Sequence, residues 1–251
     1  MTKYFKYFIY LYVFIGFSSS NAGAYDDFFK AIHFDRTQEV AQLVARGMDV
    51  NTPNEKGIPA LMVAIQSGSE KTALWLAQQP KSKVEFENSV GETPLMLAAL
   101  NNQLAVCEVL IAREAAVNRK GWTPLHYAAT KGHVPIMRLL LQENAYIDAE
   151  SPNGTTPLMM AAYYAPPLAV KFLLEEGADP NLRNQANASA LDLAQTAERA
   201  QSAAYIQAFL EAWRVQDMKD EEAAKQDSQQ QTQGQEAAKP GTAGSTGSKA
   251  K

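Results

Sequence analysis

Few side chains in this sequence could carry catalytic or metal-binding chemistry, and they are widely separated. The chain has three histidines, His33, His126 and His133, and one cysteine, Cys107. A cysteine nucleophile needs a histidine base close to it in space, and a structural zinc site of the usual kind needs several cysteine or histidine ligands. We therefore expect Cys107 to be a buried, inert thiol that packs as a small hydrophobic residue.

The carboxylates and the absence of known catalytic motifs also argue against an active site. Asp26–Asp27 and Asp220–Glu222 are runs of neighbouring acidic residues near the ends of the chain, where such charges are usually solvated. The sequence has no glycine-rich phosphate loop and no G-x-S-x-G nucleophile motif. We predict no catalytic residue, no metal ligand and no cofactor, and we expect a protein that is not an enzyme.

The elements that position two of the histidines come from a repeated seven-residue block. The clearest copy is Thr123–Ala129, which reads TPLHYAA and is followed by Gly132-His133. Thr93–Ala99 and Thr156–Ala162 are close copies, and Ile58–Ala64 is a weaker one. A glycine stands shortly before each block, so the blocks mark a long internal repeat.

The spacing and the block together resemble the ankyrin repeat, which recurs about every 33 residues and carries the pattern T-P-L-H-x-A. An apolar second stretch, such as Val134–Leu141, follows each block. The resemblance implies an all-α fold, an α-solenoid in which each repeat adds two helices and a hairpin loop. It also implies that His126 and His133 hold loops and helix starts together by hydrogen bonds.

The local chemistry of the clearest copy agrees with a helix-turn-helix unit. Thr123 suits an N-cap whose oxygen accepts a backbone N–H, and Pro124 suits the first helical position. Gly132 would end this helix. Ile136 and Leu140 lie one turn apart on the apolar face of the second helix.

We count six repeats within residues 25–215, with the outer two acting as caps. The first cap covers about Asp26–Asn51, and the last repeat begins at Ser189. Three segments depart from the pattern: the shortened loop Asn118–Gly121, the irregular loop Pro80–Val84 and the turn Ala165–Pro167.

Residues 1–24 have the pattern of a secretory signal peptide. Lys3 and Lys6 precede the apolar run Tyr7–Phe17, and Ala22–Ala24 forms an A-x-A cleavage site. The apolar run is shorter than the roughly 20 residues that span a membrane. We expect cleavage after Ala24 and no membrane insertion afterwards, with an uncleaved N-terminal anchor as the alternative.

Residues 216–251 are rich in Gln, Ala, Gly, Ser, Thr and Lys, and they contain no aromatic residue. Such a segment cannot bury enough apolar surface to offset its ordering entropy, so we predict a disordered C-terminal tail. The chain has a formal net charge of −4 and no basic patch, which argues against a nucleic-acid partner.

A protein partner is the binding function that the resemblance implies, on the concave surface of hairpin tips and first helices. The register of the repeats places the following candidate binding residues there: Val90, Glu92, Leu100, Trp122, Lys131, Asn153, Tyr163 and Tyr164. Exposed Trp and Tyr side chains dominate many interface energies, so Trp122, Tyr163 and Tyr164 are the predicted anchors. By the same register, Tyr127 and Met160 are predicted to face the core.

These observations predict a monomeric, non-enzymatic adaptor or accessory factor in the bacterial periplasm, with a protein partner that the sequence does not identify. Two alternatives stay open. One is a secreted effector that binds host proteins, and the other is an enzyme with an unrecognised site.

Overall fold

The computed structural model describes residues 23–237. Residues up to Ile206 form one compact unit, and the chain from Gln207 onward belongs to a second unit. The predicted signal peptide lies outside the described residues except for Gly23 and Ala24, which begin a helix over residues 23–33. All regular structure in residues 23–237 is helical, apart from one isolated bridge between Pro53 and Pro59.

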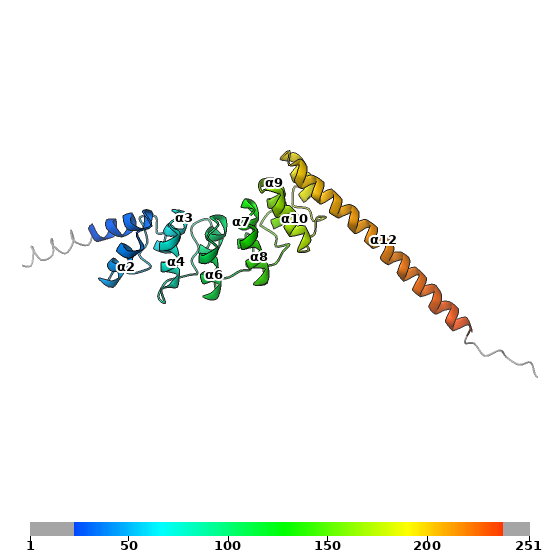
Figure 1. The fold of residues 1–251 in the computed structure, drawn as a ribbon, viewed down its shortest axis with the longest axis horizontal. Helices are drawn as coiled ribbons and strands as arrows, with labels where there is room; N and C mark the ends of the chain where they lie inside the picture. Colours follow the sequence, from blue (N-terminus) through cyan, green and yellow to red (C-terminus); the bar gives the residue numbers. More distant parts are fainter. Residues whose placement is uncertain (1–22, 238–251) are drawn as a thin grey trace, which may run out of the picture. The chain divides into compact units, whose positions relative to one another are not determined.

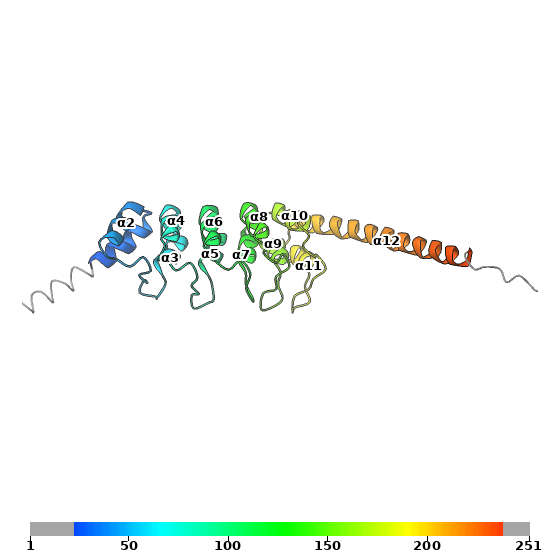
Figure 2. The same cartoon turned by 90° about the horizontal axis from the view of Figure 1, so that it is seen from below.

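The first unit is a stack of helix pairs, as the repeats predicted (Figure 1). The inner helix of each pair forms from the repeated block, and the outer helix forms from the second apolar stretch. Figure 2 shows the outer helices in one row and the inner helices in a second row, from which the hairpin loops extend. After the helix over residues 23–33, the inner helices are α3 (Ala60–Gln66), α5 (Pro94–Leu100), α7 (Pro124–Lys131), α9 (Pro157–Tyr164) and α11 (Ala190–Thr196). The outer helices are α2 (Thr37–Ala45), α4 (Glu70–Gln78), α6 (Leu104–Ala112), α8 (Val134–Gln142) and α10 (Pro167–Glu175).

The core runs along the stack, between inner and outer helices. Small residues such as Ala128 and Ala129 are fully buried, which lets neighbouring inner helices approach each other. Ile136 and Leu140 fill the opposite side of the same layer from α8. Cys107 is buried in α6, as predicted, and burial raises the pKa of its thiol to about 12. A thiol that resists ionisation to this degree is a packing residue.

Most inner helices begin with the hydroxyl cap that the repeated block predicts. The hydroxyls of Thr93 and Thr156 accept hydrogen bonds from the backbone N–H groups three residues later, and Ser189 does the same in α11. Thr123 is the N-cap of α7, as predicted, and its hydroxyl also contacts Nδ1 of His126 at 2.9 Å. In this copy the imidazole ring occupies the space beside the cap, so hydroxyl and ring pair with each other.

The turns between inner and outer helices also follow the repeat, with one exception. Four of them contain a residue in the left-handed region, such as Gly132 at φ 73° or Asn102 at φ 58°. In the fifth repeat the corresponding Ala165 has φ −89°, and Pro166 follows it at the start of α10. The sequence predicted this departure. Ala165 is fully buried, and Pro166 packs directly against the turn at Gly132.

The irregular loop at Pro80–Val84 is held by one side chain from the next repeat. The guanidinium of Arg113 donates hydrogen bonds to the carbonyls of Ala77, Gln79, Pro80 and Ser82, at 2.6 to 3.2 Å. These carbonyls lie in the last turn of α4 and in the loop that follows it, and the last carbonyls of a helix have no partner inside the helix. Arg113 therefore replaces the glycine exit that this repeat lacks.

Polar side chains at equivalent positions link successive exit loops. Asn51 accepts from the N–H of Lys83, and Asn118 accepts from the N–H of Tyr146. The amide groups of the same two asparagines also donate to carbonyls of the next repeat. These bonds set the spacing between neighbouring repeats.

The predicted C-terminal tail begins at Gln216, within helix α12 (Ala200–Ala237), and residues 238–251 lie outside the described part of the chain. Alanine, glutamine, glutamate and lysine are strong helix formers, and a helix satisfies its own backbone hydrogen bonds without a hydrophobic core. Within residues 23–237, no helix has the combination of length and apolar character that a membrane span requires.

Candidate functional site

The two histidines of the repeated block have structural partners. Nε2 of His126 lies 2.9 Å from the carbonyl oxygen of Thr155 in the next hairpin, and Nδ1 accepts the N–H of Thr123. Burial lowers the pKa of the His126 imidazole to about 4, against an opposing contribution from its backbone hydrogen bonds. Nε2 of His133 lies 3.1 Å from the carbonyl oxygen of Leu100. Both rings tie one repeat to a neighbour, as the resemblance implied.

The remaining candidates for chemistry also have packing or bridging roles. His33 lies on the surface, with Nδ1 2.8 Å from the hydroxyl of Ser67, and Asp35 accepts the N–H of Thr72. Across the part of the chain that the structure describes, no group of three or more His, Cys, Asp or Glu side chains is arranged to hold a metal ion.

The predicted residues on the hairpin loops divide into exposed and structural groups. Val90 is 75% exposed at the tip of its hairpin, and Asn153 is exposed at another tip. Glu92 is half-buried, because it accepts hydrogen bonds from the amide of Asn88 and the hydroxyl of Tyr127. The side-chain oxygen of Asn153 accepts bonds within its own loop. Of this group, Val90 offers the largest free apolar contact.

Trp122 is less accessible than the sequence suggested. Its ring is half-buried and meets the imidazole of His126 edge to face, with ring centres 5.2 Å apart. Trp122 therefore packs against the imidazole whose Nε2 bonds to the next hairpin, and its side chain stays partly exposed.

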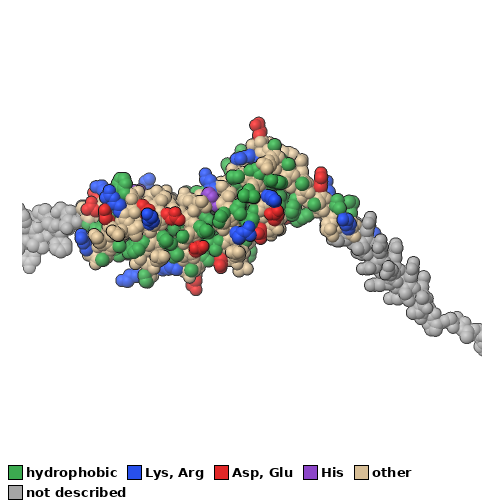
Figure 3. Space-filling view, in the orientation of Figure 1, with side chains coloured by type: hydrophobic (Ala, Val, Ile, Leu, Met, Phe, Trp, Pro, Cys, Tyr) green, Lys and Arg blue, Asp and Glu red, His purple; other side chains and the backbone are tan. Residues whose placement is uncertain are grey.

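The predicted residues at the ends of inner helices lie on the turn side of the stack. Tyr163 and Tyr164 end α9, with their rings in a T-shaped contact at 4.6 Å between centres. Tyr164 is 53% exposed, Tyr163 and Leu100 are half-buried, and Lys131 is exposed at the end of α7. Hydrophobic side chains gather on the surface over α9 and α10 (Figure 3).

The core assignment of Tyr127 and Met160 is wrong in part, because both side chains are only half-buried. The Tyr127 hydroxyl donates to Oε1 of Glu92 at 3.2 Å, in the neighbouring repeat. Burial, followed by the charge of Glu92, raises the pKa of Tyr127 to about 12. This position therefore supplies a polar link between hairpin and helix.

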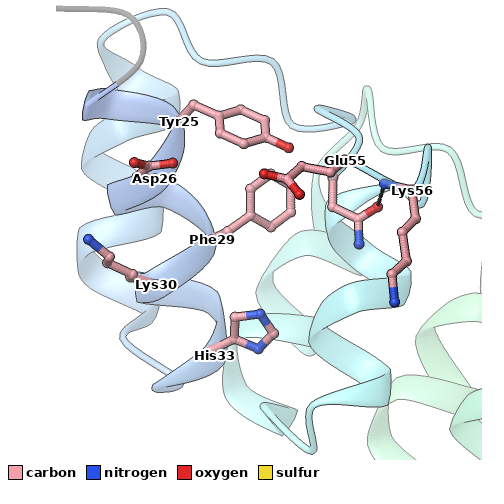
Figure 4. Close-up of a pocket in the computed structure, with 8 residues that line it drawn as sticks. Tyr25, Asp26, Phe29, Lys30, His33, Glu55 and Lys56 are labelled. Atoms are coloured by element: carbon pink, nitrogen blue, oxygen red, sulfur yellow. Dashed lines mark hydrogen bonds between the residues drawn. The ribbon is translucent and has the colours of Figure 1, made fainter.

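A hollow in the first repeat is a feature that the sequence analysis missed. It has a volume of about 300 Å³ and lies between the helix over residues 23–33 and the hairpin at residues 54–56 (Figure 4). Tyr25, Phe29 and His33 line it from the helix, and Glu55 and Lys56 line it from the hairpin. The signal was present as a spacing of four residues, which places the three rings on one helix face.

Comparisons with known proteins support the repeat assignment. Residues 80–151 and residues 114–184 each match the family model described as ankyrin repeats (3 copies). The nuclear factor NF-kappa-B p105 subunit of Gallus gallus is 30% identical over 161 residues, covering 61% of this chain and 16% of the relative. The B-cell lymphoma 3 protein homolog of Mus musculus is 30% identical over 117 residues, covering 45% of this chain and 26% of the relative. The chain thus spans about a quarter or less of either relative.

A solved structure matches a larger share of its own chain. It is the predatory endopeptidase Bd0816 of Bdellovibrio bacteriovorus in complex with the immunity protein Bd3460. The alignment has a TM-score of 0.63 and 28% identity, and it covers 72% of this chain and 96% of the matched chain. The matched chain is therefore close in extent to the repeat unit described here.

Proposed function

We propose that this chain, which contains ankyrin repeats, is a non-enzymatic adaptor or accessory factor that binds a protein partner through its inner surface. Ankyrin repeats mediate protein–protein interaction, and the family model matches residues 80–184 of this chain. The observation that carries the proposal is the aromatic group at the end of α9, where Tyr164 is 53% exposed beside Tyr163.

The physical argument rests on residue type and on rigidity. Tyrosine and tryptophan bury a large area at little cost in side-chain entropy, and they dominate the binding energy of many interfaces. The backbone of Tyr164 is fixed, because its carbonyl accepts a hydrogen bond from Arg199 at 2.8 Å. A fixed aromatic pair needs little further ordering when a partner binds.

The proposed location is the bacterial periplasm, and the support for it is the leader pattern in residues 1–24. A secreted effector that binds host proteins would use the same leader. Cell fractionation separates these alternatives, because the periplasmic protein would remain with the envelope and the effector would accumulate in the medium. N-terminal sequencing of the recovered protein tests cleavage after Ala24.

The matched complex favours a second, more specific role. That complex pairs an endopeptidase with an immunity protein, and the alignment to this chain covers 96% of the matched chain. A repeat unit that offers a fixed binding surface is suited to the immunity side of such a pair. We therefore propose inhibition of an exported peptidase as the specific form of the accessory role, and co-expression with candidate peptidases tests it.

The binding surface is tested by partner capture in cells with the full chain as bait. The test variant is Trp122→Ala, Tyr163→Ala, Tyr164→Ala, in which each lost anchor is expected to weaken binding by about 2 kcal/mol. Tyr146→Ala is the matched control, since Tyr146 is also an exposed aromatic residue but follows the outer helix α8. Capture that survives the triple change, or that Tyr146→Ala abolishes equally, would contradict the assigned surface.

A further inference from the structure

The hollow in the first repeat combines an aromatic wall with charges of opposite sign at its two ends. The rings of Tyr25 and Phe29 are 5.0 Å apart between centres and tilted by 59°. Phe28 packs edge to face on Phe29 from the buried side, which fixes the wall. The hydroxyl of Tyr25 donates to the carbonyl of Pro53 at 3.2 Å, so the ring spans from helix to hairpin.

The charged side chains around the hollow fall into two groups. Figure 4 shows the carboxylate of Glu55 between the rings of Tyr25 and Phe29, and the ammonium of Lys56 extending toward the His33 end. Asp26 and Lys30 also line the hollow, from the side of the helix that faces away from the hairpin (Figure 4). The hollow thus presents an anionic end beside the rings and a cationic end beside His33.

The pKa of Tyr25 is consistent with a negative electrostatic potential at the anionic end of the hollow. Desolvation, then the negative charges of Glu55 and Asp26, raise the pKa of the Tyr25 hydroxyl above its ordinary value. A cation placed over an aromatic ring and next to a carboxylate gains both a cation–π contact and a charge-assisted hydrogen bond.

We propose that this hollow binds a peptide segment in which a basic side chain is followed by a carboxylate. The basic side chain lies against Tyr25 and Phe29 and pairs with Glu55, and the carboxylate pairs with Lys56. Tyr25 and His33 are eight residues apart on one helix, which corresponds to about 12 Å along the axis. A two-residue segment with its side chains covers that length, because each extended residue spans about 3.4 Å.

The hairpin that carries both charges is preorganised. The side-chain oxygen of Asn54 accepts the N–H groups of Lys56 and Ile58, at 2.9 and 3.0 Å. Removing the Glu55 or Lys56 charge leaves these backbone bonds in place, and both side chains are exposed. The site lies in the first two repeats, so it is independent of the aromatic anchors at the end of α9.

The test is an NMR titration of the full chain with small defined peptides. Acetyl-Arg-Gly, with a free terminal carboxylate, and acetyl-Arg-Asp-amide, with a side-chain carboxylate, distinguish the two sources of the acid. Acetyl-norleucyl-Gly lacks the basic group, and acetyl-Arg-Gly-amide lacks the carboxylate. The expected result is a shift of the Tyr25 and Phe29 ring signals by at least one acid-bearing arginine peptide.

Matched variants assign each end of the ligand. Glu55→Gln is expected to weaken the binding of acetyl-Arg-Gly about fivefold and to leave the binding of acetyl-norleucyl-Gly unchanged. Lys56→Gln is expected to weaken the binding of acetyl-Arg-Gly by a similar factor and to leave the binding of acetyl-Arg-Gly-amide unchanged. Glu143→Gln is the control, because it removes an exposed carboxylate at the end of α8.

Three results would overturn the proposal. They are the absence of any shift of the two ring signals, equal binding of the arginine and norleucine peptides, and an equal effect of Glu143→Gln. The Trp122, Tyr163 and Tyr164 triple variant keeps the hollow, so its peptide binding is expected to equal that of the unchanged chain. Loss of partner capture in that variant therefore reports on the inner surface alone.

Discussion

His126 and Thr155 are joined by a bond between the imidazole Nε2 and a backbone carbonyl, at 2.9 Å, that links the fourth repeat to the hairpin of the fifth. Counted from the helix starts, the equivalent third residues of α3, α5 and α9 are Met62, Met96 and Met159, so α3 is shifted by one residue from the sequence alignment of its block. A methionine sulfur cannot donate to the next hairpin. One junction therefore has a polar bridge that the equivalent methionine positions lack.

The His126 bridge predicts a pH dependence of stability. Burial lowers the pKa of His126 to about 4 in the folded state from an ordinary value of 6.5, so the unfolded chain binds more protons between these values. The free energy of unfolding is expected to fall as the pH drops from about 6.5 to about 4, by up to about 1.4 kcal/mol per pH unit. Denaturant unfolding measured at several pH values checks this.

The control for that measurement is His126→Met, which copies the residue of the neighbouring repeats. It removes the titrating group and keeps an apolar side chain of similar length. Its unfolding free energy should vary less steeply with pH in the same window. Parallel pH profiles of the two proteins would show that other groups cause the dependence.

The reverse change, Met159→His, is expected to create a second bridge. Sδ of Met159 lies 3.5 Å from the N–H of Thr156, in the place that Nδ1 of His126 takes beside Thr123. The new Nε2 would face the carbonyl of Ala188, which precedes the next helix cap as Thr155 does. At pH 8, where the ring is neutral, the free energy of unfolding should rise by about 1 kcal/mol. A decrease would show that imidazole desolvation outweighs the bond.

Arg113→Ala is expected to destabilise the second and third repeats. The change leaves four carbonyls, at the end of α4 and in the following loop, without their shared donor, and the expected loss is about 2 to 3 kcal/mol. Hydrogen exchange at the amides of Gln79 and Ser82 should become faster. Arg138→Ala is the comparison, because Arg138 forms an exposed pair with Glu176 and lies over the Phe172 ring, and about 1 kcal/mol or less is expected there.

Gly132→Ala tests the contact between the fourth and fifth turns. A Cβ at Gly132 would lie 2.8 Å from Cδ of Pro166, and φ is 73°. Gly68→Ala has nearly the same φ, 71°, with nothing within 4 Å of the added atom. Thermal unfolding should show a loss of about 1 to 2 kcal/mol for Gly68→Ala and at least about 1 kcal/mol more for Gly132→Ala. Equal losses would mean that the Pro166 contact relaxes freely.

The repeated block was sufficient to predict the helix pairs, because its cap, its first-turn proline and its small residues act within one repeat or between adjacent ones. Thr93, Thr156 and the buried Ala128–Ala129 pair follow that pattern. The departure at Ala165–Pro167 was also readable, since proline has no N–H and restricts the residue before it.

Side-chain partners across repeats could not be predicted in the same way. Glu92 was predicted as a binding residue, yet it pairs with Tyr127 across 35 residues of sequence. The role of Arg113 depends on the path of a loop that carries no repeat signal. The spacing of Tyr25, Phe29 and His33 places their rings on one helix face, but the hollow itself depends on how that helix packs against a hairpin. Trp122 is less exposed than predicted for the same reason, because its ring packs against His126.

The asparagine bridges between exit loops imply a limit on cooperativity. Each of Asn51 and Asn118 reaches one repeat forward and no farther, so mechanical load or local melting passes only from neighbour to neighbour. Fraying that starts at the first repeat must break the Asn51 link before it reaches the next pair of helices. The array should thus unfold one repeat at a time, and the inner repeats should stay folded longer than the outer repeats.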